Sequence, residues 1–432
     1  MIIYYIFLII FIFALNKNFK HTLLVYIPIR IALHQGIILW PAHPTIMFDS
    51  VACFFFIAEY FLLKRNRNKK NKFPFTFPLG LYALSEFLSS FFASTSGNAP
   101  NFLQNIVVFI LFLYVIWEYI NTPQDLKLVI KGYSIIFSAA ILLSIFEQAT
   151  HFNPIIALEK ALLPANAPRG LIWESDQVRF GGIFRAQAFM SISITYGAYC
   201  VMFFLFYFFF TQKYPIYNFF QKTKNKLFTA GLALGTILSG SKAPIISIMI
   251  GFIPLLRLKW IAHVKVILPL AIIAILAFPI AKNVYEDLYM AITAENYYDY
   301  QGGSSLAMRK MQLDVSLKEF SKSPIIGNGT KYLAQAQDYY GAELLGAESI
   351  WFGLLIENGC LGIIAFITIL LYPIFMKETK HKKIYLALAL GWLSINTMTT
   401  VPGLNNTFYY TLIILLYKAQ LFKNTNNKMC TI

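Results

Sequence analysis

The sequence predicts an all-α fold, a polytopic bundle of about 12–14 transmembrane helices with two large external loops, the second partly helical. Of the 432 residues, 58% are hydrophobic and 17% aromatic, whereas only 13% are charged. The mean hydropathy is +0.60. Soluble domains do not carry so many long apolar runs. The third observation is an alternation of loop charge along the chain, which sets the orientation.

Thirteen apolar runs divide the chain, most of them near the roughly 17–25 residues that a membrane helix needs, the first and ninth being shorter. The first run has no basic residue before it and no small-residue cleavage site after it, so we expect a retained helix and not a signal peptide. The predicted spans are 2–15, 22–40, 46–63, 74–94, 102–119, 132–149, 187–210, 227–240, 244–256, 266–282, 348–376, 384–400 and 405–422.

Basic residues gather in alternate short loops. Residues 64–72 carry six positive charges, and the positive-inside rule makes such a loop cytoplasmic. Counting spans from this loop puts all the remaining Lys-rich short loops on the same, cytoplasmic side. The N-terminus is then outside and the C-terminus inside. The net charge of +16 is therefore explained by membrane orientation, and nucleic acid is not an expected partner.

The same count places two long polar segments outside the membrane. The chain then divides into N-terminal transmembrane helices (1–149), a first large loop (150–186), central helices (187–282), a second large loop (283–347), and C-terminal helices with a cytoplasmic tail (348–432). The four cysteines lie in apolar runs or in the tail, and the six histidines show no ligand spacing. We expect no metal and no cofactor.

The orientation rule does not explain basic residues on the outer side, and four of these are candidates for a binding site. Arg179 and Arg185 precede the seventh span, Lys242 follows a tight turn, and Arg309 lies at the start of a helical stretch. Guanidinium groups bind phosphate oxygens in bidentate fashion, and Lys adds a point charge. Each residue alone is as readily an interfacial anchor or an ion-pair partner, but the four together favour a phosphate-bearing ligand.

The stretch that begins near Arg309 is amphipathic. Leu306, Leu313, Leu317 and Phe320 fall on one helical face, as expected for a helix on a membrane surface. Pro324 ends this stretch, and the Gly-Asn-Gly sequence at 327–329 predicts a turn.

Glu348 and Ser349 end the second loop, and an apolar run with Gly359 and Gly362 follows. Small residues let a neighbouring backbone come close. An acid before a helix suits the cap region, where the helix dipole stabilises it, and an ionised carboxylate also suits a general base. The spacing leaves three roles open for Glu348: cap, base or ion-pair partner.

Seven charged residues lie inside predicted spans, where contact with lipid is costly. They should face the bundle or its rims, either as buried polar pairs or along a proton or ion path. The last of them follows Glu348 by nine residues, roughly 13 Å along a helix and on its opposite face, so the two are no acid–base pair. The seven are Arg30, Asp49, Glu59, Glu86, Glu118, Glu147 and Glu357.

From about residue 175 to 365, the chain resembles the O-antigen ligase / O-antigen polymerase family of bacterial membrane glycosyltransferases. That family carries a His, then Asn, Ser or Gln, nine residues and Gly-x-x-Gly, where its largest external loop meets the next helix. Glu348, Ser349, Gly359 and Gly362 match this spacing, with Glu in place of His.

Four further segments extend the resemblance. The family's Ser-Arg turn appears as Ser241-Lys242, a departure that keeps the charge but loses the guanidinium fork. The Ser-x-x-x-Arg that opens its loop helix matches Ser305 to Arg309. The family's later Pro-hydrophobic-hydrophobic-Gly-x-Gly sequence matches residues 324–329. Its basic, Gly-containing entrance to the seventh helix matches residues 179–185.

The resemblance implies an inverting, metal-independent glycosyltransferase that uses polyprenyl-diphosphate-linked sugars. Basic residues would hold the diphosphate and stabilise it as it departs, while a base takes a proton from the acceptor hydroxyl. A partly buried carboxylate can have a raised pKa, so Glu can serve where the family has His. The implied residues are Glu348 and Arg309 for catalysis, Arg179, Arg185, Lys242 and Arg309 for the diphosphate, and Ser349, Gly359 and Gly362 in support.

We therefore expect a polysaccharide polymerase that joins O-antigen or capsule repeat units at the periplasmic face of a bacterial inner membrane, with a periplasmic N-terminus and a cytoplasmic C-terminus. The partners would be a polyprenyl-diphosphate-linked oligosaccharide and membrane lipid. The first alternative is a ligase that moves the finished chain to lipid A core. The second is a flippase or transporter of the same lipid-linked sugar, which internal repeats would favour. The sequence leaves open the sugar, the linkage, the oligomeric state and the binding of a chain-length regulator.

Overall fold

The computed structural model describes residues 2–33, 38–40, 46–63, 72–93, 99–162, 177–179, 182–255, 289, 293, 306–344, 347–377, 379–399 and 404–429. The predicted span 266–282, the basic loop 64–71 and Ser305 lie outside the described residues. Within them the fold is all-α, and the strands form two short antiparallel hairpins.

The described residues of the first third of the chain form helices and one hairpin, with short turns between them. Its elements are α1 (Ile2–Lys17), α2 (Phe19–Ile29), β1 (Ile38–Trp40), β2 (Ile46–Met47), α3 (Phe48–Leu63), α4 (Thr76–Phe92), α5 (Ala99–Asn105), the π-helical η1 (Ile106–Leu111), α6 (Phe112–Tyr119) and α7 (Pro123–Thr150). The predicted span 22–40 is wrong at its end, because α2 stops at Ile29 and residues 38–40 form a strand.

The central and C-terminal parts hold the remaining elements. They are α8 (Pro154–Leu162), β3 (Val178–Arg179), β4 (Ile183–Phe184), α9 (Ser193–Lys213), η2 (Pro215–Tyr217), α10 (Lys222–Leu238), α11 (Lys242–Phe252), η3 (Ile253–Leu255), α15 (Leu306–Phe320), α16 (Tyr332–Tyr340), η5 (Gly341–Glu343), α17 (Ile350–Glu357), α18 (Gly359–Phe375), α19 (Lys382–Met398) and α20 (Leu404–Met429).

Three helical stretches of the described part are long and apolar enough to cross a membrane: Phe102–Tyr119, Pro123–Thr150 and Ser193–Lys213. Shorter apolar helices include Lys242–Phe252 and Gly359–Phe375. The polytopic bundle of about 12–14 spans stays a prediction.

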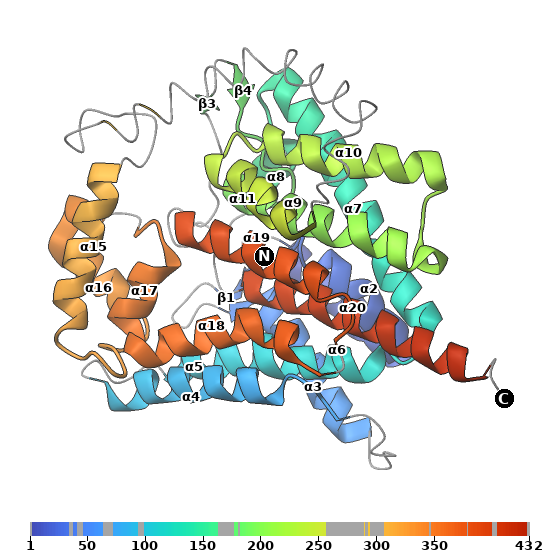
Figure 1. The fold of residues 1–432 in the computed structure, drawn as a ribbon, viewed down its shortest axis with the longest axis horizontal. Coiled ribbons are helices and arrows are strands. Elements are labelled where there is room, and N and C mark those ends of the chain that lie inside the picture. Colours follow the sequence, from blue (N-terminus) through green and yellow to red (C-terminus); the bar gives the residue numbers. More distant parts are fainter. Residues whose placement is uncertain are drawn as a thin grey trace.

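Helix α9 forms the centre of the bundle. It contacts α10, α11, α19 and α20, and most of its side chains are buried. Phe203 of α9 stacks on Phe137 of α7 with ring centroids 4.6 Å apart. At the other side of the molecule α4 lies along α18, and α15, α16 and α17 gather beyond one end of this pair (Figure 1).

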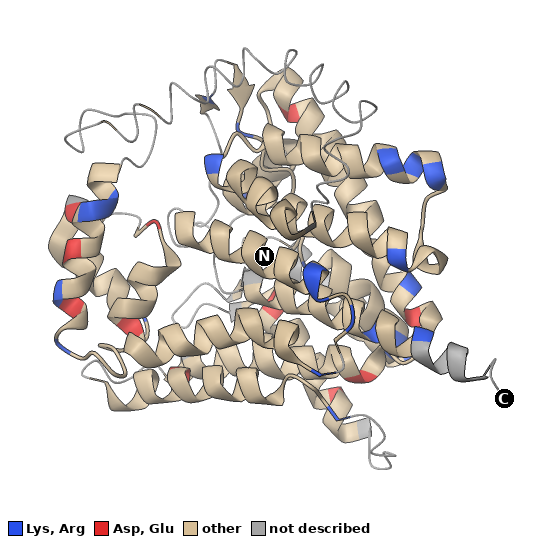
Figure 2. Cartoon of the chain, viewed as in Figure 1, with Lys and Arg blue, Asp and Glu red and all other residues tan. Residues whose placement is uncertain are grey.

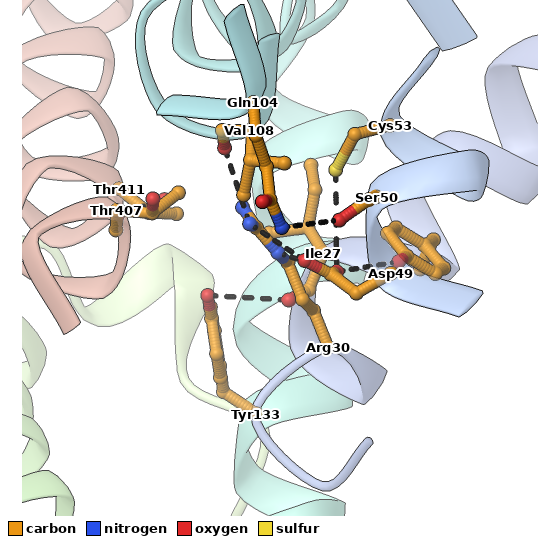
Figure 3. A network of polar contacts seen from close by, with 11 residues as sticks. Ile27, Arg30, Asp49, Ser50, Cys53, Gln104, Val108, Tyr133, Thr407 and Thr411 are labelled. Carbon is orange, nitrogen blue, oxygen red and sulfur yellow. Dashed lines mark hydrogen bonds and ion pairs between the residues drawn. The ribbon is translucent and has the colours of Figure 1, made fainter. Parts of the chain in front are cut away.

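Two of the intramembrane charges of the N-terminal helices form a buried pair. Arg30 donates from Nε to Asp49 Oδ1 over 2.8 Å and from Nη2 to Asp49 Oδ2 over 3.0 Å. Tyr26 also donates to Asp49, and Val108 of η1 accepts from Arg30 through its carbonyl oxygen (Figure 3). The guanidinium lies 4.7 Å from the centroid of the Phe112 ring. Of the two roles that the sequence left open, a buried polar pair describes Arg30 and Asp49.

The run 348–376 is not one helix, as the sequence predicted, but two that meet at Asn358. Gly359 has a φ of +60°, a conformation that ends α17 and starts α18 in a new direction. The turn 324–329 fills the break. A Cβ on Gly359 would lie 2.7 Å from the carbonyl oxygens of Pro324 and Ile325, so a glycine is required.

Backbone hydrogen bonds seal this junction from both sides. Asn328 and Gly329 donate to the last carbonyls of α17, those of Ile356 and Glu357, over 2.8 and 3.2 Å. In return Pro324 accepts from the N–H of Cys360 over 2.9 Å. Helix ends leave such groups without intrahelical partners. Here the turn 324–329 supplies donors for the last carbonyls of α17 and acceptors for the first N–H groups of α18. The close approach predicted from the glycine pair is therefore confirmed at Gly359.

We predict that Gly359→Ala destabilises the protein well beyond the effect of backbone strain. Gly341 has a similar φ of +55°, with a ψ of −122°, but no atom lies within 4 Å of its missing Cβ, so Gly341→Ala should cost about 1–3 kcal/mol through backbone strain alone. Overlap with the turn should cost Gly359→Ala about 2 kcal/mol more. Unfolding by sodium dodecyl sulfate in mixed micelles measures both. Equal losses would show that the junction is not closely packed.

Candidate functional site

Glu348 and Arg309 face each other where the second loop meets the membrane helices. Arg309 Nη2 lies 3.6 Å from Glu348 Oε2, and its Nη1 donates to the Glu348 carbonyl oxygen over 3.3 Å. The same guanidinium donates to the carbonyl of Met398 at the end of α19, over 2.8 Å. The exposed fractions of the Arg309 and Glu348 side chains are 28% and 38%, so a ligand can reach both.

Ser349, and not Glu348, caps α17. Its hydroxyl accepts from the N–H of Trp351 over 3.4 Å, and its backbone is extended. The capping role considered for Glu348 is therefore wrong, because the helix starts one residue later than that role requires. The role of ion-pair partner is confirmed by Arg309, and the role of base stays a prediction.

A second basic group comes from the β3–β4 hairpin. The side-chain oxygen of Gln177 accepts from Arg185 Nη1 over 2.6 Å and from Arg179 Nη2 over 3.1 Å. Both guanidiniums thus share one amide oxygen. Arg185 also donates to the hydroxyl of Ser241, the residue before α11, over 3.4 Å.

The tight turn before α11 lies directly against Arg185. Gly240 has a φ of +57°, and a Cβ there would come within 2.8 Å of Arg185 Cγ. The N–H of Ala186 donates to the carbonyl of Leu238 over 3.0 Å. Lys242 is the first residue of α11, adjacent in sequence to the Ser241 that Arg185 contacts.

Electrostatics connects the two groups. Burial, together with the charge of Arg179, lowers the pKa of Arg185 to about 10, and the carboxylate of Glu348 opposes both effects. Burial also lowers the pKa of Arg309, and Glu348 again opposes the shift. Glu348 therefore acts on guanidiniums from two distant segments. Within the described residues, no acceptor hydrogen-bonds to the buried Nε of Arg185.

The structure thus brings Arg179, Arg185, Arg309 and Glu348 into one electrostatic neighbourhood, with Lys242 next to it. Gly359 and Gly362 do not lie there: they belong to the far end of α17, at the junction with α18.

Sequence reasoning missed Gln177 and Gln312. Gln177 joins two arginines, and the buried Gln312 accepts from the N–H of Glu348 over 3.2 Å. Neither has a motif. The only signal was that Gln312 follows Arg309 by three residues, which places the two on one helix face.

Helix α15 exposes three of its leucines and buries several polar side chains. Leu306, Leu313 and Leu317 are 56%, 39% and 46% exposed, as the amphipathic pattern predicted. On the buried face Glu319 accepts hydrogen bonds from Lys322 and from the hydroxyls of Tyr332 and Tyr340, with distances of 2.6–2.9 Å. This hydrogen-bond cluster around Glu319 attaches α15, the helix that carries Arg309, to α16. A location on the membrane surface stays a prediction.

The hydrogen-bond cluster around Glu319 should make the stability of the second loop depend on pH in the acidic range. Burial alone would raise the pKa of Glu319, but the hydrogen bonds from Lys322, Tyr340 and Tyr332 outweigh it, and the pKa lies below the usual value. A lowered folded pKa contributes stability above the unfolded pKa, about 4.3, and this stability is lost as pH falls through the folded pKa.

Glu319→Gln should therefore lower the thermal unfolding midpoint at neutral pH and approach the wild-type midpoint as pH falls below about 4. Glu343→Gln, at an exposed acid of the same loop, should show a smaller difference at every pH. A constant gap between Glu319→Gln and the wild type would contradict the linkage.

Residues 227–367 match the family described as O-antigen ligase. The matched stretch runs from α10 into α18 and contains Lys242, Arg309 and Glu348, whereas Arg179 and Arg185 precede it. No curated protein matches the chain. The resemblance seen in the sequence is confirmed for this stretch.

Proposed function

We propose that this protein is a polysaccharide polymerase that joins polyprenyl-diphosphate-linked repeat units of an O-antigen or capsule. The observation that carries the proposal is the ion pair of Glu348 with Arg309, in which the Glu348 carboxylate also acts electrostatically on Arg185. One acid among several cations suits a reaction in which an anion departs and a proton is removed. The O-antigen ligase match supports the chemistry in general.

The arginines would bind the diphosphate of the donor. Arg185 remains a cation at neutral pH even with its lowered pKa. The shared Gln177 oxygen holds Arg179 and Arg185 together, and like-charged groups held together in a partly buried site attract a multivalent anion strongly. As the bond to the sugar breaks, these cations would stabilise the diphosphate that leaves. This electrostatic role requires no metal.

Glu348 would be the base. The acceptor hydroxyl oxygen attacks the anomeric carbon opposite the diphosphate, the bond from that carbon to the diphosphate oxygen breaks, and the hydroxyl proton passes to the Glu348 carboxylate. Attack from the opposite face inverts the anomeric centre. The 3.6 Å separation from Arg309 Nη2 is longer than a strong ion pair, so Glu348 can turn toward an acceptor.

The site would open to the periplasm of an inner membrane. Figure 2 shows the basic residues of the first turns of α10 at the edge of the molecule opposite α15 and α17. Such a separation supports a cytoplasmic location for the α10 end and an external one for the site. The polyprenyl chain would then remain in the bilayer while the sugars lie outside it.

A ligase is the second candidate, because the matching family bears that description. Purified protein separates the two functions. We predict that it converts lipid-linked repeat units into a ladder without lipid A core. Glu348→Gln should lower the rate by about 10²–10⁴. Product formed only when lipid A core is added would establish the ligase.

Two variants serve as controls for the base. Glu348→His offers a base at nearly the same place and should retain part of the activity. Glu343→Gln changes an acid of the same loop and should remain active. Loss of the ladder in Glu343→Gln but not in Glu348→Gln would move the base into the loop.

Arg309 gives a further prediction. Arg309→Ala should abolish polymer, and Arg309→Lys should restore little, because a point charge replaces a two-pronged donor. Lys310→Ala is the matched control, since its neighbouring side chain lies on the exposed side of α15 and should leave the ladder unchanged. Ladder length on gels checks all three. Equal effects at both positions would indicate that general charge matters and a specific contact does not.

A further inference from the structure

The segments that carry the candidate site contact two helices, α4 and α7, that precede the matched residues 227–367. Its donor half consists of the β3–β4 hairpin and the start of α11, and its base half consists of α15 and α17. Each half is attached to an N-terminal helix, α7 or α4, by a buried carboxylate that the proposed reaction does not use.

Glu147 of α7 holds the segment just after Arg185. Its side chain is fully buried, and its two oxygens accept from the N–H groups of Gln187 and Ala188 over 3.0 and 2.7 Å. Ala188 has a φ of +51°, which a non-glycine residue adopts only when its surroundings hold it. Asn153 donates to the Ala188 carbonyl over 2.8 Å. The turn that leads away from Arg185 is therefore held from both sides.

Glu86 of α4 holds the far end of α17. One of its oxygens accepts from the side-chain amide of Asn358 and the other from that of Asn105, each over 3.2 Å. Asn358 ends α17, and a Cβ on Gly362 would overlap the Asn358 side chain, so Gly362 makes room for this contact.

The next turn of α4 adds two contacts to the same junction. Ser89 donates to the carbonyl of Glu357 over 2.6 Å, and the hydroxyl of Ser90 lies 3.0 Å from that of Thr330. Figure 1 shows α4 passing beneath this end of α17 and α18. Helix α17 has eight residues, about 12 Å, so a shift at Asn358 is carried to its other end. Glu348 lies immediately beyond that end.

We propose that Glu147 and Glu86 are positioning residues, the first for Arg185 and the second for α17 with Glu348. The inference rests on the proposed function and deepens it. Both oxygens of Glu147 accept from the segment after Arg185. One oxygen of Glu86 accepts from Asn358 at the end of α17, and the other accepts from Asn105 of α5.

At position 147 Gln has the same shape but only one acceptor, and its amide nitrogen would face a backbone N–H group. At position 86 both donors are Asn side-chain amides, which can turn to offer an oxygen, so Leu is the substitution that removes the contacts there. Glu147→Gln and Glu86→Leu therefore break these contacts with little change in side-chain volume.

The two residues should affect different kinetic constants. With purified protein and lipid-linked repeat units, Glu147→Gln should raise KM for the donor about tenfold, because the diphosphate site is displaced. Glu86→Leu should lower kcat about 10- to 100-fold and leave the donor KM within about twofold, because only the base moves. Ser85→Ala, a buried change on α4 one residue from Glu86, should alter neither constant.

Partial misfolding must be separated from misplacement. Titration with polyprenyl diphosphate that bears no sugar counts the intact donor sites, and kcat is expressed per site. Glu86→Leu should bind this lipid as tightly as the wild type. The double variant Glu86→Gln/Asn358→Asp exchanges the two roles, since the amide donor then lies on α4 and the carboxylate acceptor at the end of α17. This variant should recover most of the lost kcat.

The outcomes distinguish the two proposals. Should Glu348→Gln turn over normally, the proposed function itself is wrong. Should Glu348→Gln be inactive while both carboxylate variants keep wild-type KM and kcat per site, only the positioning inference fails. Changes of the same constant in both variants, or no recovery in the double variant, would also overturn it.

Discussion

The structure depends on the interlocked backbone at the junction of α17 and α18. An apolar run of this length would ordinarily continue as one membrane helix, which satisfies its own backbone groups. Here the chain breaks at Asn358, and the turn 324–329 supplies the missing partners for both new helix ends. The loop and the membrane helices are thereby joined through main-chain hydrogen bonds. The carboxylate of Glu357 adds a contact to the loop, accepting from the N–H of Leu333 over 3.1 Å.

Because α17 ends there and does not continue in line with α18, its first turn lies beside α15 and α19. Arg309 can then contact both the start of α17 and the end of α19. Glu348 acts on guanidiniums from the loop and from the hairpin before α9. A site assembled from four separate segments requires that each be held firmly, and the hydrogen-bonded carboxylates Glu86, Glu147 and Glu319 hold three of them.

Charges inside apolar helices are costly in lipid, and in this chain they bind specific partners. Arg30 and Asp49 connect α2, α3 and η1, and the described residues to which they hydrogen-bond lie outside the candidate site. Glu86, Glu147 and Glu357, by contrast, all accept from N–H groups of segments that lead to it. Charged residues in predicted spans thus connect helices of the bundle in one place and contact segments near the candidate site in another.

The sequence by itself determined the helical class, most helix locations, the exposed leucine face of α15 and the family resemblance. These properties depend on local composition, on a periodicity that a single helix imposes, and on motif spacing. Only the tertiary structure decided that 348–376 is two helices, that Ser349 is the cap, and that Gln177 and Gln312 belong to the site. The break requires a turn more than twenty residues earlier in the chain to accept and donate its hydrogen bonds. No local pattern contains that contact, because hydrogen bonds between distant segments follow from how the helices pack.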